Sequence, residues 1–126
     1  MNIICIEPDV VLAKVYQQAF TQGGEHSCKM CLDPQAAIEQ IDTQKPDIIV
    51  MELQLAPLSG FAFLQELRSY EDLTDIPVVI YSSVPQESFA ASSDVWRTWG
   101  VRRYFYKPAT SINKVAAFVH SGGYAS

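Results

Sequence analysis

The most constraining feature of the sequence is a strict alternation of short strand-like runs with segments of helical periodicity. In each segment apolar residues recur every three or four positions, which predicts an amphipathic helix. The predicted strands cover residues 3–6, 27–32, 48–51, 77–81 and 101–106. Strands in such a series are parallel, because each helix carries the chain back across the sheet.

The number and order of these units predict the fold class. The central runs are apolar throughout, as expected when helices cover both faces of a sheet. Crossovers between parallel strands are right-handed, and the chain has 126 residues. Together these favour a doubly wound, three-layer α/β domain with five helices. Its five-stranded parallel sheet would have the flavodoxin-like order 2-1-3-4-5. We treat residues 1–126 as a single domain, since this length suits one compact unit.

Caps and breakers predict the helix limits. Asp9 and the Asp33-Pro34 pair are typical helix starts, and glycines 23–24 are a typical helix end. A fourth helix is predicted from Phe89 to Trp99, where Gly100 stops it.

The apolar positions of the helices predict what each one buries. For the first helix these positions are Val11, Leu12, Val15, Tyr16, Ala19 and Phe20. In the third helix, Phe61 is predicted to lie in the core and Phe63 to flank it. The last helix is predicted to bury Ile112, Val115, Ala116 and Val119.

Composition excludes several classes of protein. With 9 Lys+Arg against 14 Asp+Glu the net charge is -5, which disfavours nucleic acid as a direct ligand. No apolar stretch approaches the ~18–20 residues of a membrane span. Residues 1–4 have no basic region and enter a strand, so we expect no signal peptide. Three cysteines without an export signal fit a reduced, cytoplasmic protein.

Polar residues follow four of the predicted strands. They are Glu7, Glu52, Ser82 and Lys107. In a doubly wound sheet, ligands bind beyond the carboxyl ends of the strands. Two carboxylates, a hydroxyl and an ammonium are therefore expected to meet at one edge. Polar residues also end strands for purely structural reasons, but all four together favour a site.

These motifs resemble the receiver domain of two-component signal transduction, and the chain is similar to single-domain chemotaxis response regulators. The resemblance spans essentially the whole chain. It rests on residues 3–7, 46–52, 58–61, 76–83 and 104–108. Receivers accept a phosphoryl group on an aspartate at the end of the third strand, with Mg²⁺ bound by an acidic pair after the first strand.

The resemblance assigns roles to individual residues. Ser82 matches the hydroxyl residue and Lys107 the lysine that contact the phosphoryl group, while Tyr104 matches the aromatic residue that changes rotamer with the switch. It also implies a cis peptide bond between Lys107 and Pro108, which X-Pro chemistry permits.

Two positions depart from the family pattern. Glu52 stands at the phosphoacceptor position, and the acidic pair is reduced to Glu7 followed by Pro8. The extra methylene of Glu moves the carboxylate by roughly an ångström, and misplacement on that scale can cost ~100-fold in rate. Glu7 and Glu52 are left as the Mg²⁺ ligand candidates of a weakened site, and we expect no cofactor. The pattern indicates a degenerate receiver, or pseudo-receiver.

The predicted function is therefore a non-enzymatic phosphorelay signalling module that is not phosphorylated and acts through protein–protein interaction. One alternative is an active receiver that is phosphorylated at an unconventional site. Another is a small flavodoxin-like enzyme that binds a cofactor. That alternative needs a Gly-, Ser- or Thr-rich phosphate loop after the first strand, and residues 7–11 hold two acids instead.

The candidate partner surface comprises helix 4, strand 5 and helix 5, as the resemblance implies. It contains Trp96, Trp99, Arg102 and Arg103, a composition typical of an interface core with a polar rim. The partner would be a histidine kinase, an output domain or a second copy, with no membrane involved. The alternative is that the tryptophans are ordinary packing residues.

Cys28 and Cys31 form a C-x-x-C pattern. A redox pair usually sits at a helix N-terminus, whereas both cysteines fall on a predicted strand and point to opposite faces. His26 adds at most a third soft ligand, where structural zinc requires four. We interpret both cysteines as small apolar strand residues.

Overall fold

The computed structural model describes residues 1–56, 58–89 and 93–123. Its strands are β1 (Asn2–Ile6), β2 (Ser27–Cys31), β3 (Ile48–Met51), β4 (Val78–Ser82) and β5 (Val101–Tyr106). Its α-helices are α1 (Val10–Thr21), α2 (Pro34–Thr43), α3 (Gly60–Arg68), α4 (Ser93–Thr98) and α5 (Ile112–His120). The sheet is parallel throughout with the order β2-β1-β3-β4-β5, which confirms the predicted fold class.

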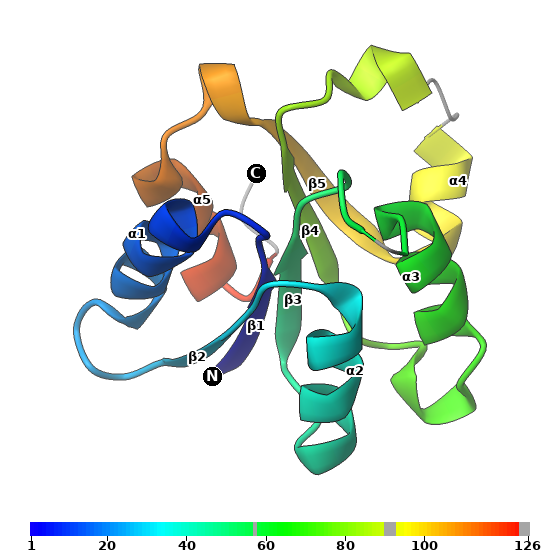
Figure 1. The fold of residues 1–126 in the computed structure, drawn as a ribbon, viewed down its shortest axis with the longest axis horizontal. Helices are drawn as coiled ribbons and strands as arrows, with labels where there is room; N and C mark the ends of the chain where they lie inside the picture. The colour runs from blue at the N-terminus through cyan, green and yellow to red at the C-terminus, as the bar shows by residue number, and fades with distance from the viewer. Residues whose placement is uncertain (57, 90–92, 124–126) are drawn as a thin grey trace.

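The molecule has three layers, with α1 and α5 on one side of the sheet and α2, α3 and α4 on the other (Figure 1). The two faces bury separate apolar cores. Phe20 and Val115 belong to the core under α1 and α5, and Phe63 and Leu64 belong to the core under the other three helices. Alternate residues of each strand serve the two cores, which explains why the central strands are apolar at every position.

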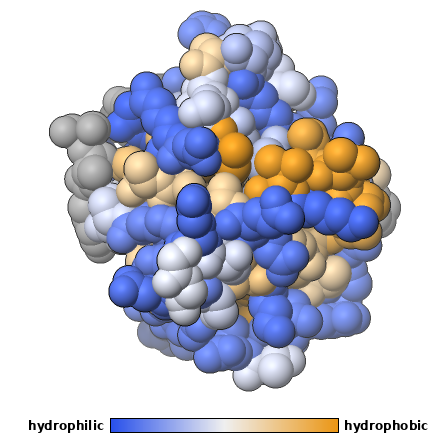
Figure 2. Space-filling view, turned by 90° about the vertical axis from the view of Figure 1, so that its left-hand side faces the viewer, coloured by the Kyte–Doolittle hydropathy of each residue, from blue (hydrophilic) through white to orange (hydrophobic). Residues whose placement is uncertain are grey.

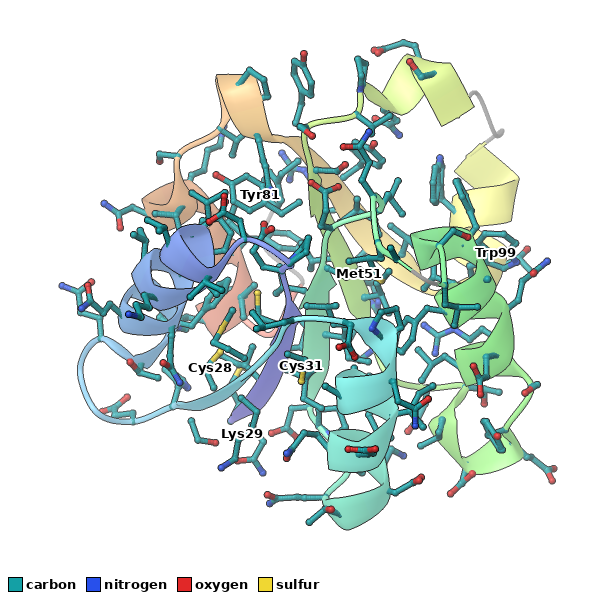
Figure 3. All side chains as sticks on the ribbon, viewed as in Figure 1. Cys28, Lys29, Cys31, Met51, Tyr81 and Trp99 are labelled. Carbon is teal, nitrogen blue, oxygen red and sulfur yellow. The ribbon has the colours of Figure 1, made fainter. Side chains whose placement is uncertain are left out.

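Cys28 and Cys31 lie on opposite faces of β2, one in each core, as the odd spacing predicts (Figure 3). Both thiols are free and buried, and burial raises the pKa of Cys28 to about 12 and that of Cys31 to about 11. Thiols with such pKa values are largely protonated at neutral pH and poor nucleophiles. They act here as apolar packing residues.

Two predicted helix faces differ from the structure. In α1, Ala13, Tyr16, Ala19 and Phe20 are buried, but Val11 and Val15 face outward, because the apolar stripe is wider than the face that meets the sheet. In α3, Phe63 is the buried core residue and Phe61 is half-buried, the reverse of the prediction. Leu67, four residues after Phe63, shares its buried face.

The fourth predicted helix begins in a different conformation, because Phe89 lies in a 3₁₀ turn. Residues Gln86–Phe89 form a 3₁₀ turn, and α4 covers Ser93–Thr98. The part of the prediction at residues 90–92 lies outside the described residues. Residues 86–95 include three serines and one aspartate, and these residue types favour caps and turns over helix interiors.

The loop after β3 is held against the start of α3. The backbone N–H of Gly60 donates to the carbonyl of Leu53 at 3.0 Å. A Cβ at Gly60 would lie 2.8 Å from the Cα of Leu53, so only glycine allows this approach. This contact fixes the backbone that follows Glu52. Within the described residues, no helix is both long and apolar enough to span a membrane.

Candidate functional site

Parallel pairing brings the carboxyl ends of β1, β3, β4 and β5 to one edge of the sheet. Ile6 pairs with Met51, so Glu7 and Glu52 leave adjacent strands together. Their side chains are buried, with 3% and 4% of each residue exposed, and Ser82 is fully buried. Lys107 follows β5 and reaches the same point. All four predicted residues therefore meet.

The Glu52 carboxylate is surrounded by hydrogen-bond donors. Its Oε2 accepts from the backbone N–H groups of Leu53 at 2.6 Å and Gln54 at 3.1 Å, and from the hydroxyl of Ser82. Its Oε1 accepts from the backbone N–H of Ser83 at 3.3 Å. These donors come from the loops after two neighbouring strands. Such a convergence of backbone N–H groups and a hydroxyl is a typical anion-binding arrangement.

Lys107 bridges the two buried carboxylates. Its Nζ lies 2.9 Å from Oε1 of Glu52 and 2.5 Å from Oε1 of Glu7. Lys107 and Glu52, which were expected to meet at this edge, therefore form an ion pair, and Glu7 is a second partner of Lys107. The other oxygen of Glu7 accepts from the backbone N–H of Asp9 at 3.1 Å. The two carboxylates thus share a single ammonium in a site with little access to water.

Hydrogen bonding outweighs burial in setting the ionisation of this cluster. Burial by itself raises the pKa of Glu52, but hydrogen bonds from Ser82 and Lys107 bring that pKa below its ordinary value. Burial would likewise lower the pKa of Lys107, yet its bonds to Glu7 and Glu52 raise it. Glu52 and Lys107 are therefore both charged at neutral pH.

The residues at this edge do not suit Mg²⁺, the ion that the fold family implies. Mg²⁺ needs a near-octahedral set of oxygen ligands. Pro8 supplies no side-chain oxygen, and the Asp9 carboxylate caps α1 through the N–H groups of Val11 and Leu12. Glu7 and Glu52 each bind the ammonium of Lys107 through one oxygen, so a positive charge already lies between the two carboxylates. The described residues contain no group of three His, Cys, Asp or Glu side chains placed to hold a metal.

A chain of hydrogen bonds runs from Glu52 towards β5. The Ser82 hydroxyl donates to Glu52 and accepts from the backbone N–H of Val84 at 3.1 Å. The carbonyl of Val84 accepts from the hydroxyl of Tyr104 at 2.5 Å. We call this series the Ser82–Tyr104 relay. It connects the buried carboxylate to the aromatic residue that sequence reasoning singled out.

Tyr104 turns inward and joins an aromatic cluster. Its ring lies 5.7 Å from that of Trp96, which in turn lies 5.7 Å from Phe61. Trp96 is 5% exposed and packs in the core, which favours the packing alternative for this residue over an exposed interface anchor. Its indole Nε1 is buried without a hydrogen-bond partner. Trp99 is half-buried and lies beside α3, edge-on to Phe61 (Figure 3).

A shallow hollow of about 380 Å³ lies along α4 and β5. Arg97, Arg102 and Tyr104 are among the residues that line it. Arg103 also borders the hollow, but its guanidinium lies over the rings of Phe105 and Phe118, on the α5 side of β5. The hollow is therefore cationic, with the rings of Trp96 and Tyr104 in its walls, and its use as a partner surface stays a prediction.

Several contacts at the site have no side-chain signal in the sequence. The N–H groups of Leu53, Gln54 and Ser83 reach Glu52 through loop conformation, which no residue type specifies. The role of Val84 likewise rests on its backbone alone. Pro108 lies in the turn Lys107–Ala109, and the cis geometry of its peptide bond stays a prediction.

Comparison with known proteins assigns the family. Residues 3–117 match the model of the response regulator receiver domain, so the chain belongs to that family. Receiver domains are signalling modules of two-component systems that act with kinases and output domains.

Individual relatives agree with this assignment. Over 113 residues the chain is 27% identical to a protein-glutamate methylesterase/protein-glutamine glutaminase of Chromobacterium violaceum, covering 89% of this chain and 31% of that protein. It thus spans about a third of that relative's length, and only its receiver region is matched. A Treponema denticola protein of the same description is 32% identical over 75 residues, 60% of this chain and 19% of that protein.

Solved structures show the same fold. A sensor protein from Polaromonas sp. JS666 superposes with a TM-score of 0.82 at 20% identity, covering 96% of this chain and 94% of the other. The receiver domain of Francisella response regulator 1452 superposes with a TM-score of 0.79 at 23% identity, with the same coverage.

Proposed function

We propose that this protein is a receiver that signals through protein–protein contact without being phosphorylated. Glu52 takes the place of the phosphoacceptor aspartate and keeps a permanent negative charge at the centre of the site. In this proposal the protein is cytoplasmic, catalyses no reaction of its own and needs no Mg²⁺.

The observation that carries the proposal is the hydrogen bonding of the Glu52 carboxylate. Donors that in a receiver would serve a phosphoryl group, Ser82 and Lys107 among them, are already bound to its two oxygens. Glu52 supplies about one negative charge where an acyl phosphate would bring roughly two. The carboxylate is thus a partial substitute for the phosphorylated residue, with its partners already in place.

The output would follow from the inward position of Tyr104. The Ser82–Tyr104 relay links the Glu52 charge to a tyrosine that borders the hollow beside α4 and β5. Large aromatics beside arginines are enriched in protein interfaces. We infer that a kinase, an output domain or a second copy binds the α4–β5–α5 face, with Trp99, Arg97 and Arg102 contributing.

Phosphorylation is the direct test. We expect intact-mass measurement after treatment with acetyl phosphate or phosphoramidate and Mg²⁺ to show no added phosphoryl group. The reason is that Glu52 is misplaced for attack and its charge is held by Lys107. A receiver with an acceptor aspartate, treated in parallel, is the positive control.

Two further outcomes separate the alternatives. A stoichiometric mass gain that is lost in Glu52→Gln would contradict the proposal, and one that survives in Glu52→Gln would indicate an unconventional acceptor. The double variant Pro8→Asp with Glu52→Asp restores both acids, and we expect it to regain some labelling. If it does not, other parts of the site have also diverged from an active receiver.

A further inference from the structure

The N-terminal half of α1 exposes apolar residues where a surface helix is ordinarily polar. Val10, Val11 and Val15 are 51%, 71% and 45% exposed. Lys14 lies between them and is the one charged residue of the helix, which contains no acid. We call Val10, Val11, Lys14 and Val15 the α1 ridge. Figure 2 shows apolar side chains gathered on the side of the molecule that α1 and α5 form.

A groove of about 530 Å³ lies between α2 and α3 on the other side of the sheet. We call it the α2–α3 groove. Its floor includes buried Ile41, Phe63 and Leu67. Tyr70, which is 50% exposed, stands at its edge. Concave apolar surfaces of this size are typical of binding sites.

The rim of the α2–α3 groove is acidic. Asp42, Glu66 and Asp72 line it, and its one lysine, Lys45, is bound to Asp75 at 2.9 Å. An occupant that suits this groove is a helix with an apolar stripe and a positive charge beside it. Such helix-in-groove contacts use residues one turn apart as anchors.

The α1 ridge has that chemistry. Val11 and Val15 are one turn apart and form the apolar stripe, and Lys14 beside them suits the acidic rim. The helix itself contains no carboxylate that the rim would repel, and the nearest one, the N-cap Asp9, accepts hydrogen bonds from the N–H groups of Val11 and Leu12. The chain thus carries both a convex apolar, cationic helix and a concave apolar, acidic groove.

We propose that the α1 ridge of one copy of this chain docks in the α2–α3 groove of a second copy. The ridge and the groove lie on opposite sides of the sheet, so the ridge of a molecule cannot reach the groove of the same molecule (Figure 1). The contact is therefore head-to-tail, and such heterologous contacts form rings or open chains. It uses neither Glu52 nor the α4–β5 face, so it stands independently of the function proposed above.

Sedimentation equilibrium over a concentration series tests the proposal with the full chain. We expect the average mass of the wild type to rise above the 14.1 kDa of a monomer. The ridge variant Val11→Glu with Val15→Glu, and the groove variant Asp42→Lys with Asp72→Lys, should each stay monomeric. All four positions are exposed, so both variants should fold, which circular dichroism checks.

Mixing the two variants gives the decisive result. The intact ridge of the groove variant can enter the intact groove of the ridge variant, so the mixture should form dimers and stop there. If the groove variant dimerises alone, the contact is ridge-to-ridge or uses the α4–β5 face, and the proposal is wrong. If the ridge variant dimerises alone, the contact is groove-to-groove or uses the α4–β5 face, and the proposal is wrong as well. A wild type that stays monomeric throughout also overturns it.

Lys29→Glu is a matched charge control. Lys29 is exposed on β2, away from the ridge and the groove lining, and its reversal makes the net charge as negative as the two valine changes do. This variant should self-associate like the wild type. If it is also monomeric, net charge and not the α1 ridge governs association, and the proposal fails.

Discussion

Lys107 stabilises two buried carboxylates at once, which makes its removal costly. Lys107→Met leaves Glu7 and Glu52 without a cation in a site with little access to water. Breaking a buried ion pair in this way typically costs about 3–5 kcal/mol in free energy of unfolding. We expect a loss of that size in urea unfolding at neutral pH.

The free energy of unfolding should rise again in steps as the unpaired carboxylates are replaced. Lys107→Met with Glu52→Gln should be more stable than Lys107→Met, and adding Glu7→Gln should raise it again. The order matters more than the magnitudes, because polar replacements keep some of the hydrogen bonds. Equal stabilities for the single and double variants would show that Lys107 and Glu52 are not energetically coupled.

At this scale the sequence predicts which side chains meet but not what they bind. Glu7, Glu52, Ser82 and Lys107 were found because each follows an apolar run and parallel strands end together. For Trp96 the sequence left an interface role and a packing role open, and the residue is buried in the core. Which side of a six-residue helix faces inward depends on packing, and an aromatic residue suits both settings.

At the scale of elements, Arg68 fastens three segments together. From the end of α3 its Nε, Nη1 and Nη2 donate to the carbonyls of Trp99 at 2.8 Å, Leu73 at 2.9 Å and Ile76 at 2.7 Å. A lysine has no planar fork to reach three acceptors. We expect Arg68→Lys to lower the free energy of unfolding by about 2–4 kcal/mol.

Lys29→Arg is the control for this prediction. Lys29 is exposed on β2, so exchanging one cation for the other should change the free energy of unfolding by no more than about 0.5 kcal/mol. Thermal and urea unfolding of both variants would decide the matter. Equal effects of the two changes would mean that the three carbonyl contacts of Arg68 contribute little.

Hydrophobic periodicity and caps predict the order and type of the elements. They predict less well which face of each helix is buried. Asp9, Asp33 and Ser59 cap their helices through side-chain hydrogen bonds, which local sequence suffices to predict for the first two. The rotation of α1 that exposes Val11 depends on how the helix meets the sheet and α5. That is tertiary information, absent from a periodicity count.

For the whole molecule, pH should act on stability through two groups in succession. Burial and the neighbouring His120, 4.3 Å away ring to ring, lower the pKa of His26. The unfolded chain then binds a proton first, so stability should fall as pH drops below about 6.5. The pKa of Glu52 is also lowered. Its carboxylate therefore stabilises the folded state at pH values above the ordinary pKa of 4.5, and this stabilisation is lost as the pH falls further.

Urea unfolding as a function of pH separates the two contributions. His26→Gln should remove the first decline and leave the second, and Glu52→Gln should do the reverse. The amine of Met1 lies 3.2 Å from Nδ1 of His26 and contributes to the first decline. An unchanged acid profile in Glu52→Gln would mean that its carboxylate is no better stabilised in the folded state than in the unfolded one.

The coupling between the buried carboxylate and the α4–β5 face can be measured by fluorescence, because both tryptophans of the chain lie near that face. Glu52→Gln weakens the hold on Ser82, and Ser82→Ala removes the hydroxyl that binds Val84. Either change should loosen Tyr104 from Val84 and let its ring move away from Trp96.

We therefore expect a red-shifted emission and stronger iodide quenching in both variants, because Trp96 would gain contact with water. Tyr104→Phe should give the same shift, since it removes the last hydrogen bond of the Ser82–Tyr104 relay. Thr43→Ala, on the exposed end of α2, should leave the emission unchanged. If Tyr104→Phe shifts the emission but Glu52→Gln and Ser82→Ala do not, the aromatic cluster is independent of the Glu52 charge. The partner face would then not be under the control of the site.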